Sequence, residues 1–360
     1  DKYGEKRRTE IIEDFTSLGI EDMIAEEEMV LTITHNGYIK RTSLSTYRSQ
    51  RRGGRGVQGA SSREEDFVEH LFIANTHSYI LFFTDKGKCY WVKVYDIPEG
   101  GRAAKGRAIV NLIGCEPDEK VSAFISVKEF NDDHFVVMAT EKGIVKKTKL
   151  SAYSNPRKKG IYAVEIRDGD RLIEARVSTG DNDILLGTRN GKAIRFSEEQ
   201  IRPSGRKTMG VKGITLSSED DRLVGMLLIK REGTTVLVAT EKGFGKRTEI
   251  AQYRAQKRGG KGVLTMKTTD KVGKMVTIKE VVDNDDLMII TNQGVLIRVP
   301  VAQIRSIGRA TQGVKLIKLG EGTLVSSITR IMTEENNENE IVEVEGENEI
   351  NNPKSEEAAI

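Results

Sequence analysis

Two short basic loops rich in glycine are the residues of this chain best suited to chemistry. The loops are Gln50-Arg51-Arg52-Gly53-Gly54-Arg55-Gly56 and its near copy Gln256-Lys257-Arg258-Gly259-Gly260-Lys261-Gly262. Glycine lets a backbone approach a surface closely and turn its N–H groups outward, and Arg offers a planar fork that matches phosphate oxygens. The loops therefore indicate anion binding, and the alternative is a solvated flexible loop.

The charge of the chain is divided between a basic middle and acidic ends. The 360 residues carry a formal net charge of +3, yet residues 29–330 hold 52 basic and 34 acidic groups, a net of +18. A charge of that size favours a polyanion such as nucleic acid over a neutral small molecule, with an ordinary soluble surface as the alternative. Residues 331–360 hold ten Glu against one Lys. We expect this acidic tail to be disordered, and either to compete with DNA for the basic middle or only to aid solubility.

Motifs of enzymes, metal sites and membrane proteins are missing from the sequence. Its four His lack the spacing of metal ligands, and neither a P-loop nor a dinucleotide-binding glycine motif is present. The two Cys form no C-x-x-C, which fits a reducing cytosol, and no apolar run is long enough to span a membrane. We therefore expect no catalytic residue, metal or cofactor in this chain. Because the chain begins at Asp1, we expect it to be part of a longer protein.

An internal repeat runs through the basic middle. Six tetrads of Thr, two polar residues and Gly recur at intervals of 48 to 56 residues, with their glycines at Gly37, Gly87, Gly143, Gly191, Gly243 and Gly294. A second glycine follows each tetrad glycine by 17 or 19 residues, at Gly56, Gly106, Gly160, Gly210, Gly262 and Gly313. Repeats of this length are typical of propellers and solenoids.

Each repeat has the pattern of about four antiparallel β-strands. A β-branched run such as 135–139 precedes each tetrad, which predicts a hairpin, and the second glycine opens a further strand. Six such units predict an all-β, six-bladed β-propeller over residues 29–330, because radial closure hides most strand edges. An open solenoid is the alternative, since spacing alone does not show that the first and last blades meet.

Basic residues recur at equivalent places in the repeats. Arg or Lys stands four positions after the tetrad glycine in five repeats, and Trp91 stands there in the second. Equivalent positions of a propeller share one radial face, so we expect a belt of positive charge around the rim, suited to a curved duplex. The predicted rim set comprises Lys40, Arg41, Lys146, Lys147, Lys158, Lys159, Arg195, Arg206, Lys207, Lys246, Arg247, Lys257, Arg258, Lys261 and Arg298.

The heptapeptide at 50–56 is identical to the signature box of the DNA gyrase A subunit, and the six basic blades resemble the C-terminal domain of that subunit. Residues 2–10 resemble the segment that leads into this domain, so residues 1–28 are expected to be a connector from the breakage-reunion part. The resemblance implies a β-pinwheel, a propeller whose blades exchange strands. It further implies that duplex DNA wraps around the rim with positive handedness, which presents a segment for ATP-dependent negative supercoiling.

The resemblance assigns ring closure and wrapping to the box residues Gln50, Arg51, Arg52, Gly53, Gly54, Arg55 and Gly56. It also implies that the cleavage chemistry, ATP and Mg²⁺ belong to other parts of gyrase. The implied partners are double-stranded DNA and the other A and B subunits of an A2B2 enzyme in the bacterial cytoplasm, at the nucleoid, with the isolated domain a monomer. Two alternatives remain: a topoisomerase IV-type domain that selects substrates, and a propeller that binds an acidic protein.

Overall fold

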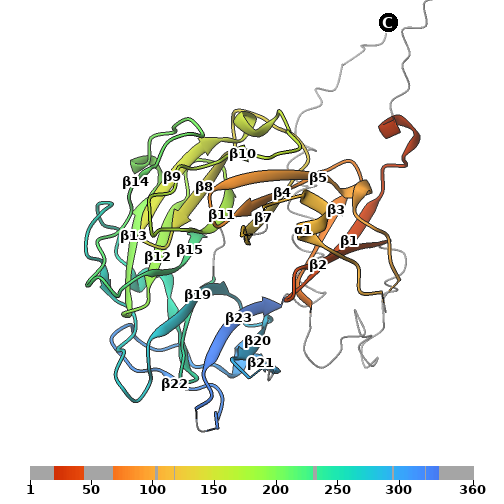
Figure 1. The fold of residues 1–360 in the computed structure, drawn as a ribbon. Helices are drawn as coiled ribbons and strands as arrows, with labels where there is room; N and C mark the ends of the chain where they lie inside the picture. The colour runs from red at the N-terminus through yellow and green to blue at the C-terminus, as the bar shows by residue number, and fades with distance from the viewer. Residues whose placement is uncertain are drawn as a thin grey trace, which may run out of the picture.

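The computed structural model describes residues 20–43, 68–101, 104–116, 118–229, 233–293, 296–320 and 322–331. In these residues nearly all regular structure is β-strand, arranged as six small antiparallel sheets around a common centre (Figure 1). The prediction of an all-β, six-bladed propeller is confirmed. The heptapeptide at 50–56, most of the predicted connector and all but the first residue of the predicted tail lie outside the described residues.

Each sheet contains a hairpin whose strands flank one Thr-x-x-Gly tetrad. In the first, the Gly37 amide donates to the Thr34 carbonyl at 2.9 Å, and Gly37 has a φ of +76°, which glycine adopts without strain. The hairpin strands are β1 (Glu28–Thr34) and β2 (Tyr38–Ser43), β4 (Tyr79–Thr84) and β5 (Lys88–Lys93), β8 (Phe135–Thr140) and β9 (Ile144–Lys149), β12 (Asp183–Thr188) and β13 (Lys192–Ser197), β16 (Thr235–Thr240) and β17 (Phe244–Glu249), and β20 (Asp286–Thr291) and β21 (Leu296–Pro300).

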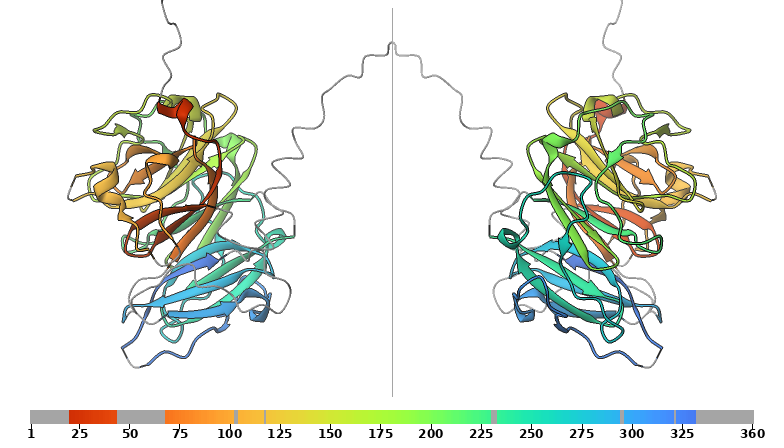
Figure 2. Two further views of the ribbon diagram at one scale, coloured as in Figure 1. Left: turned by 90° about the vertical axis from the view of Figure 1, so that its right-hand side faces the viewer. Right: turned by 90° about the vertical axis from the view of Figure 1, so that its left-hand side faces the viewer.

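A third strand pairs with the first strand of each hairpin and lies on the inner side of the ring. These strands are β3 (Val68–Asn75), β7 (Val121–Val127), β11 (Leu172–Ser178), β15 (Leu223–Ile229), β19 (Met275–Val281) and β23 (Val325–Ile331). Contacts between third strands run from β7 through to β23, and β23 contacts β3 of the first sheet (Figures 1 and 2). The ring is therefore closed, which excludes the open solenoid.

The fourth, outer strand of five sheets is supplied by the next repeat. Each outer strand has two residues, begins directly after the second glycine of its repeat, and pairs with the second hairpin strand of the preceding sheet. These strands are β6 (Arg107–Ala108) on β2, β10 (Ile161–Tyr162) on β5, β14 (Val211–Lys212) on β9, β18 (Val263–Leu264) on β13 and β22 (Val314–Lys315) on β17. This is the strand exchange expected of a pinwheel. In the sixth sheet, the described residues supply three strands.

The core lies between successive blades. Buried apolar residues of neighbouring sheets form shared clusters. In one of them the rings of Phe83 and Tyr153 pack edge to face, with their centroids 5.9 Å apart. Helical structure in the described residues is short. It comprises α1 (Ile109–Ile113) and the 3-10 turns η1 (Ile20–Met23), η3 (Val94–Asp96), η4 (Leu150–Tyr153), η5 (Glu198–Gln200), η6 (Ile250–Gln252) and η7 (Val301–Gln303).

Candidate nucleic-acid interface

Between each of the turns η3 to η7 and the outer strand that follows, the chain forms a loop at the periphery of the ring. We call these segments, at 98–106 apart from residues 102 and 103, which lie outside the described residues, and at 154–160, 202–210, 254–262 and 305–313, the rim loops. Four rim loops are fastened to the preceding blade by an equivalent backbone hydrogen bond. The donor and acceptor pairs are Gly100 N to Arg41 O at 3.0 Å, Ser204 N to Lys147 O at 2.9 Å, Gln256 N to Arg195 O at 2.8 Å and Ile307 N to Arg247 O at 2.9 Å.

The glycine that ends each rim loop has no room for a side chain. Gly262 has a φ of +67°, and a Cβ atom there would lie 2.5 Å from the Ala193 carbonyl oxygen of the preceding blade. The backbone therefore touches the neighbouring sheet directly at this point. This close approach explains why the second glycine recurs in every repeat.

Successive rim loops are also joined to one another. The residues just beyond one outer strand donate to the next rim loop, as Thr215 N does to Gly260 O at 2.9 Å and Lys267 N does to Thr311 O at 2.9 Å. The Gly259 amide donates in the opposite direction, to Gly213 O, at 2.7 Å. The rim loops of the later blades thus form a continuous hydrogen-bonded belt.

The box-like loop at 256–262 shows how a loop of this composition is held. Arg258 lies inward: its Nη1 donates to Lys212 O at 2.6 Å and its Nε donates to Gln200 O at 3.2 Å. Lys257 and Lys261 are exposed on either side of it. The loop therefore uses its arginine for support and presents its lysines to solvent.

The members of the predicted rim set that lie in the rim loops are accessible to a ligand. Arg206 and Arg258 are half-buried, and five lysines are exposed, namely Lys158, Lys159, Lys207, Lys257 and Lys261. Their role in DNA binding remains a prediction.

The basic residues four positions after the tetrad glycine have acidic partners, and all of them except the exposed Arg298 are buried or half-buried, which corrects the expectation that they form an exposed belt. Arg41, Lys147, Arg195, Arg247 and Arg298 form ion pairs with Glu99, Glu198, Asp183, Asp283 and Asp286, respectively. Three of the arginines also reach the next blade, where Arg41 Nε donates to Ile97 O at 2.7 Å and Arg247 Nε to Ile304 O at 2.8 Å. Arg195 does so through Nη1, which donates to Tyr253 O at 3.3 Å. Arg41, Lys147, Arg195 and Arg247 thus brace neighbouring blades, whereas Arg298 is exposed and pairs with Asp286 of its own blade.

Lys40, Lys146 and Lys246, one position earlier, are buried, with relative exposures of 2%, 1% and 0%. Lys40 Nζ donates to Gly101 O at 3.0 Å and Lys146 Nζ to Ala163 O at 2.6 Å. Burial lowers the pKa of Lys40, and it lowers the pKa of Lys146 to about 7 and that of Lys246 to about 8, with Arg206 and Arg309 adding repulsion at the latter two. The expectation of direct DNA contact by these three lysines is not supported, because their ammonium groups are enclosed by the protein.

Three exposed arginines were missed by the sequence analysis. Arg202, Arg254 and Arg305 each stand eight positions before the glycine that ends their rim loop, and all three are exposed. Arg48 occupies the same position in the first repeat. An alignment of the repeats on the second glycine would have found these arginines. An alignment on the tetrad glycine instead selects mostly the basic residues that brace neighbouring blades.

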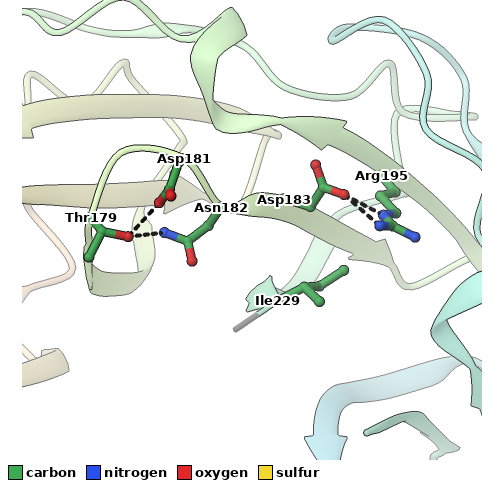
Figure 3. Close-up of a pocket in the computed structure, with 6 residues that line it drawn as sticks. All are labelled: Thr179, Asp181, Asn182, Asp183, Arg195 and Ile229. Carbon is green, nitrogen blue, oxygen red and sulfur yellow. Dashed lines mark hydrogen bonds and ion pairs between the residues drawn. The ribbon is translucent and has the colours of Figure 1, made fainter. Parts of the chain in front are cut away.

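A shallow pocket of the molecule lies beside one of these braces. Thr179, Asp181, Asn182, Asp183, Arg195 and Ile229 line it (Figure 3). Arg195 faces Asp183, with its Nε donating at 2.7 Å, and Asp181 adds a second carboxylate, so the lining does not suit a phosphate. In the described ranges, His, Cys, Asp and Glu form no cluster of three that could hold a metal. None of the helices described there is long and apolar enough to cross a membrane.

Each of the six repeats matches the same protein family. The model of the DNA gyrase C-terminal domain, a β-propeller, matches residues 28–75, 78–128, 134–179, 182–230, 234–281 and 285–331. The chain belongs to this family. Each match covers the three inner strands of one blade, so the gyrase C-terminal repeat is the unit from which the ring is built.

Curated gyrase subunits are similar over nearly all of the chain. The DNA gyrase A subunit of Staphylococcus aureus (strain MRSA252) is 47% identical over 343 residues, which is 94% of this chain and 39% of that protein. The same subunit of Staphylococcus epidermidis (strain ATCC 12228 / FDA PCI 1200) is 46% identical over 340 residues, again 94% of this chain and 38% of that protein. The chain thus spans about two fifths of the length of the curated relatives it matches.

Solved structures share the fold. The crystal structure of the C-terminal domain of DNA topoisomerase IV superposes with a TM-score of 0.77 at 26% identity, covering 91% of this chain and all of that one. A structure of the DNA gyrase A C-terminal domain superposes with a TM-score of 0.66 at 24% identity and covers 85% of this chain and all of that one. At 24% identity, the second likeness concerns the fold alone.

Proposed function

We propose that this gyrase C-terminal domain binds duplex DNA along its rim loops and bends it around the ring with a positive wrap. The observation that carries the proposal is the belt of linked rim loops, which presents exposed lysines and arginines blade after blade. Smooth bending of 20 to 30 base pairs costs on the order of 1 to 6 kcal/mol, so a wrapping surface needs many distributed contacts. Phosphate contacts of this kind need no base-edge readout.

The charge on one flat face of the ring supports binding at the rim. The loops that lead from each third strand to the next blade share one face, and several of them carry exposed carboxylates, at Asp132, Asp133, Asp181 and Asp283. Carboxylates repel phosphates, so Asp133 and Asp181 disfavour DNA on this face, whereas ion pairs with Lys149 and Arg247 neutralise Asp132 and Asp283. The same charges disfavour the alternative of an acidic protein docked on this face.

The box at 50–56 has a defined place in this proposal. In five blades, the outer strand follows a rim-loop glycine of the next repeat, and Gly56 is the equivalent glycine of the first repeat. The sixth blade is the one that this order would match with the first repeat, and the described residues supply three of its strands. We infer that the box helps to close the ring and is required for wrapping, as the resemblance of these residues to the gyrase box implies.

The remaining assignments follow from the parent family. We propose that the domain works within a gyrase A subunit, beside the B subunit in an A2B2 enzyme of the bacterial cytoplasm, where ATP and Mg²⁺ act on other parts. A topoisomerase IV-type role in substrate choice is the second candidate, which the superposition on that enzyme's C-terminal domain at a TM-score of 0.77 favours.

The test is to relax closed circular DNA with a nicking-sealing enzyme in the presence of the domain. Wrapping leaves a linking-number change whose sign reports handedness, and we expect a positive wrap. The variant Arg51→Ala/Arg52→Ala/Arg55→Ala should abolish this change while retaining most of the affinity for short linear duplex. Binding without any linking-number change in the unaltered domain would contradict wrapping, and binding with no salt dependence would contradict a phosphate interface.

A further inference from the structure

Two kinds of rim loop alternate around the ring, and the residue beneath the loop alternates with them. Three positions after the tetrad glycine, the first, third and fifth blades carry Lys40, Lys146 and Lys246. The second, fourth and sixth carry Tyr90, Ile194 and Ile297. The loops that lie above a lysine share a Gly-Arg pair that begins five positions before the glycine that ends the loop. These pairs are Gly101-Arg102, Gly205-Arg206 and Gly308-Arg309. The other loops have Asn155-Pro156, Lys257-Arg258 and, by register, Arg51-Arg52 there.

The buried lysines collect backbone carbonyls of the loop above them. Lys246 Nζ donates to Gly308 O at 2.6 Å, to Arg309 O, and to Thr311 Oγ1 at 3.0 Å. Lys146 Nζ donates to Arg206 O and to Ala163 O. Each lysine is thus matched to the loop of the following repeat.

Carbonyl oxygens that point toward an incoming phosphate would repel it. An ammonium beneath the loop draws these oxygens inward and adds a positive charge close to the rim. The cost is large, because burying a charge is unfavourable and neither Lys146 nor Lys246 has a carboxylate ion-pair partner among the described contacts. Tyrosine or isoleucine serves the same place in the alternate blades, so packing alone does not require a lysine.

We propose that Lys146 and Lys246 are positioning residues for DNA, which hold their rim loops in the conformation that receives phosphate without touching the DNA themselves. This inference rests on the proposed function of the rim. It divides the rim into lysine-supported loops, at 202–210 and 305–313, and box-type loops such as 254–262. Loss of the lysines should weaken DNA binding at their own loops and leave the box-type loops intact.

The matched test compares Lys146→Met/Lys246→Met with Lys142→Met/Lys242→Met. At about pH 6, below the pKa of both buried lysines, both pairs remove two positive charges, but Lys142 and Lys242 are exposed in the tetrad turns. Affinity for linear duplex is measured against salt concentration. We expect the buried pair to reduce the slope of log affinity against log salt by about 0.9 for each phosphate that the rim no longer binds, and the exposed pair to leave it unchanged. Equal slopes in the two variants would overturn the proposal.

A pH profile provides a readout that a purely structural role would not change. The charged groups facing Lys146 are Arg206 and Glu165, and the group facing Lys246 is Arg309. Because burial places the pKa of these lysines at about 7 and about 8, both lose their proton as the pH rises from about 6 to about 9. DNA binding by the unaltered domain should weaken over this range, and the Met pair should flatten that decline.

The outcomes separate this inference from the proposed function. If the unaltered domain does not bind DNA in a salt-dependent way, the proposed function fails. If it binds, but its affinity does not fall between about pH 6 and about pH 9, only the positioning role fails. The second result decides the matter even if the Met pair does not fold, because it uses the unaltered protein alone.

Discussion

At the scale of single residues, the basic side chains of the repeat have three separate duties. Those in the rim loops are exposed or half-buried, most of those four positions after the tetrad glycine brace neighbouring blades, and three lysines lie beneath the rim. The Lys147–Glu198 pair is the most enclosed brace, with side-chain exposures of 5% and 0% at an Nζ–Oε1 distance of 3.0 Å. At the place of Glu198, other blades have apolar residues such as Leu150 and Ile250. This pair is therefore a local substitute for apolar packing.

Removing one partner of this pair should be costly. Glu198→Ala leaves Lys147 charged and buried without its carboxylate, and we expect a loss of about 3 to 5 kcal/mol in the free energy of unfolding. The double variant Lys147→Met/Glu198→Leu should recover most of that loss, because apolar packing replaces the buried ion pair. Trp91 and Leu150 fill the same two places with apolar side chains between the second and third blades. Urea denaturation of the three proteins measures this. Equal destabilisation in the single and double variants would contradict a charge-specific role.

At the scale of the element, the second glycine decides whether an outer strand can reach the preceding blade. Gly262 combines a positive φ with a carbonyl 2.5 Å from any added Cβ. Gly205, in the rim loop of another repeat, has open space around its Cβ position and no positive φ. Two glycines of similar loops therefore differ in their tolerance of a side chain.

Gly262→Ala should destabilise the domain, by about 1 to 3 kcal/mol for the strained backbone and further for the displaced β18. Gly205→Ala should be neutral or stabilise slightly, because it only restricts the unfolded chain. Thermal unfolding of the two variants, side by side, checks the difference. The close approach of blades at Gly262 would be in doubt if both variants unfolded at the same temperature as the unaltered domain.

At the scale of the whole molecule, a closed ring gives the rim loops a fixed spacing and direction. The contact between β23 and β3 joins the two ends of the array. The chain combines a net charge of +18 over residues 29–330 with a strongly acidic segment at 331–360. Opposite charges within one chain attract each other, and salt screens this attraction.

Deletion of residues 332–360 should tighten DNA binding at low salt, or increase the wrap, by removing a competitor for the basic rim. The difference should shrink as the salt concentration rises, because screening weakens the competition. A tail of equal length with Gln in place of each Glu is the matched control, and it should behave like the deletion. Unchanged affinity and linking number in the deletion variant would leave the tail a solubilising role only.

The sequence by itself determined the blade count, the hairpins and the family, because glycines with positive φ and β-branched runs are local requirements that recur in every repeat. The identity of the exposed cations was decided only by the tertiary structure. Lys146 and Lys207 are basic residues of two neighbouring repeats, yet one is 1% exposed beneath a rim loop and the other faces solvent. Burial of a charge depends on carbonyls supplied by a loop about sixty residues away, as for Lys146 and Arg206. Ring closure was likewise a tertiary result, since a contact between β3 and β23 leaves no local mark in either strand.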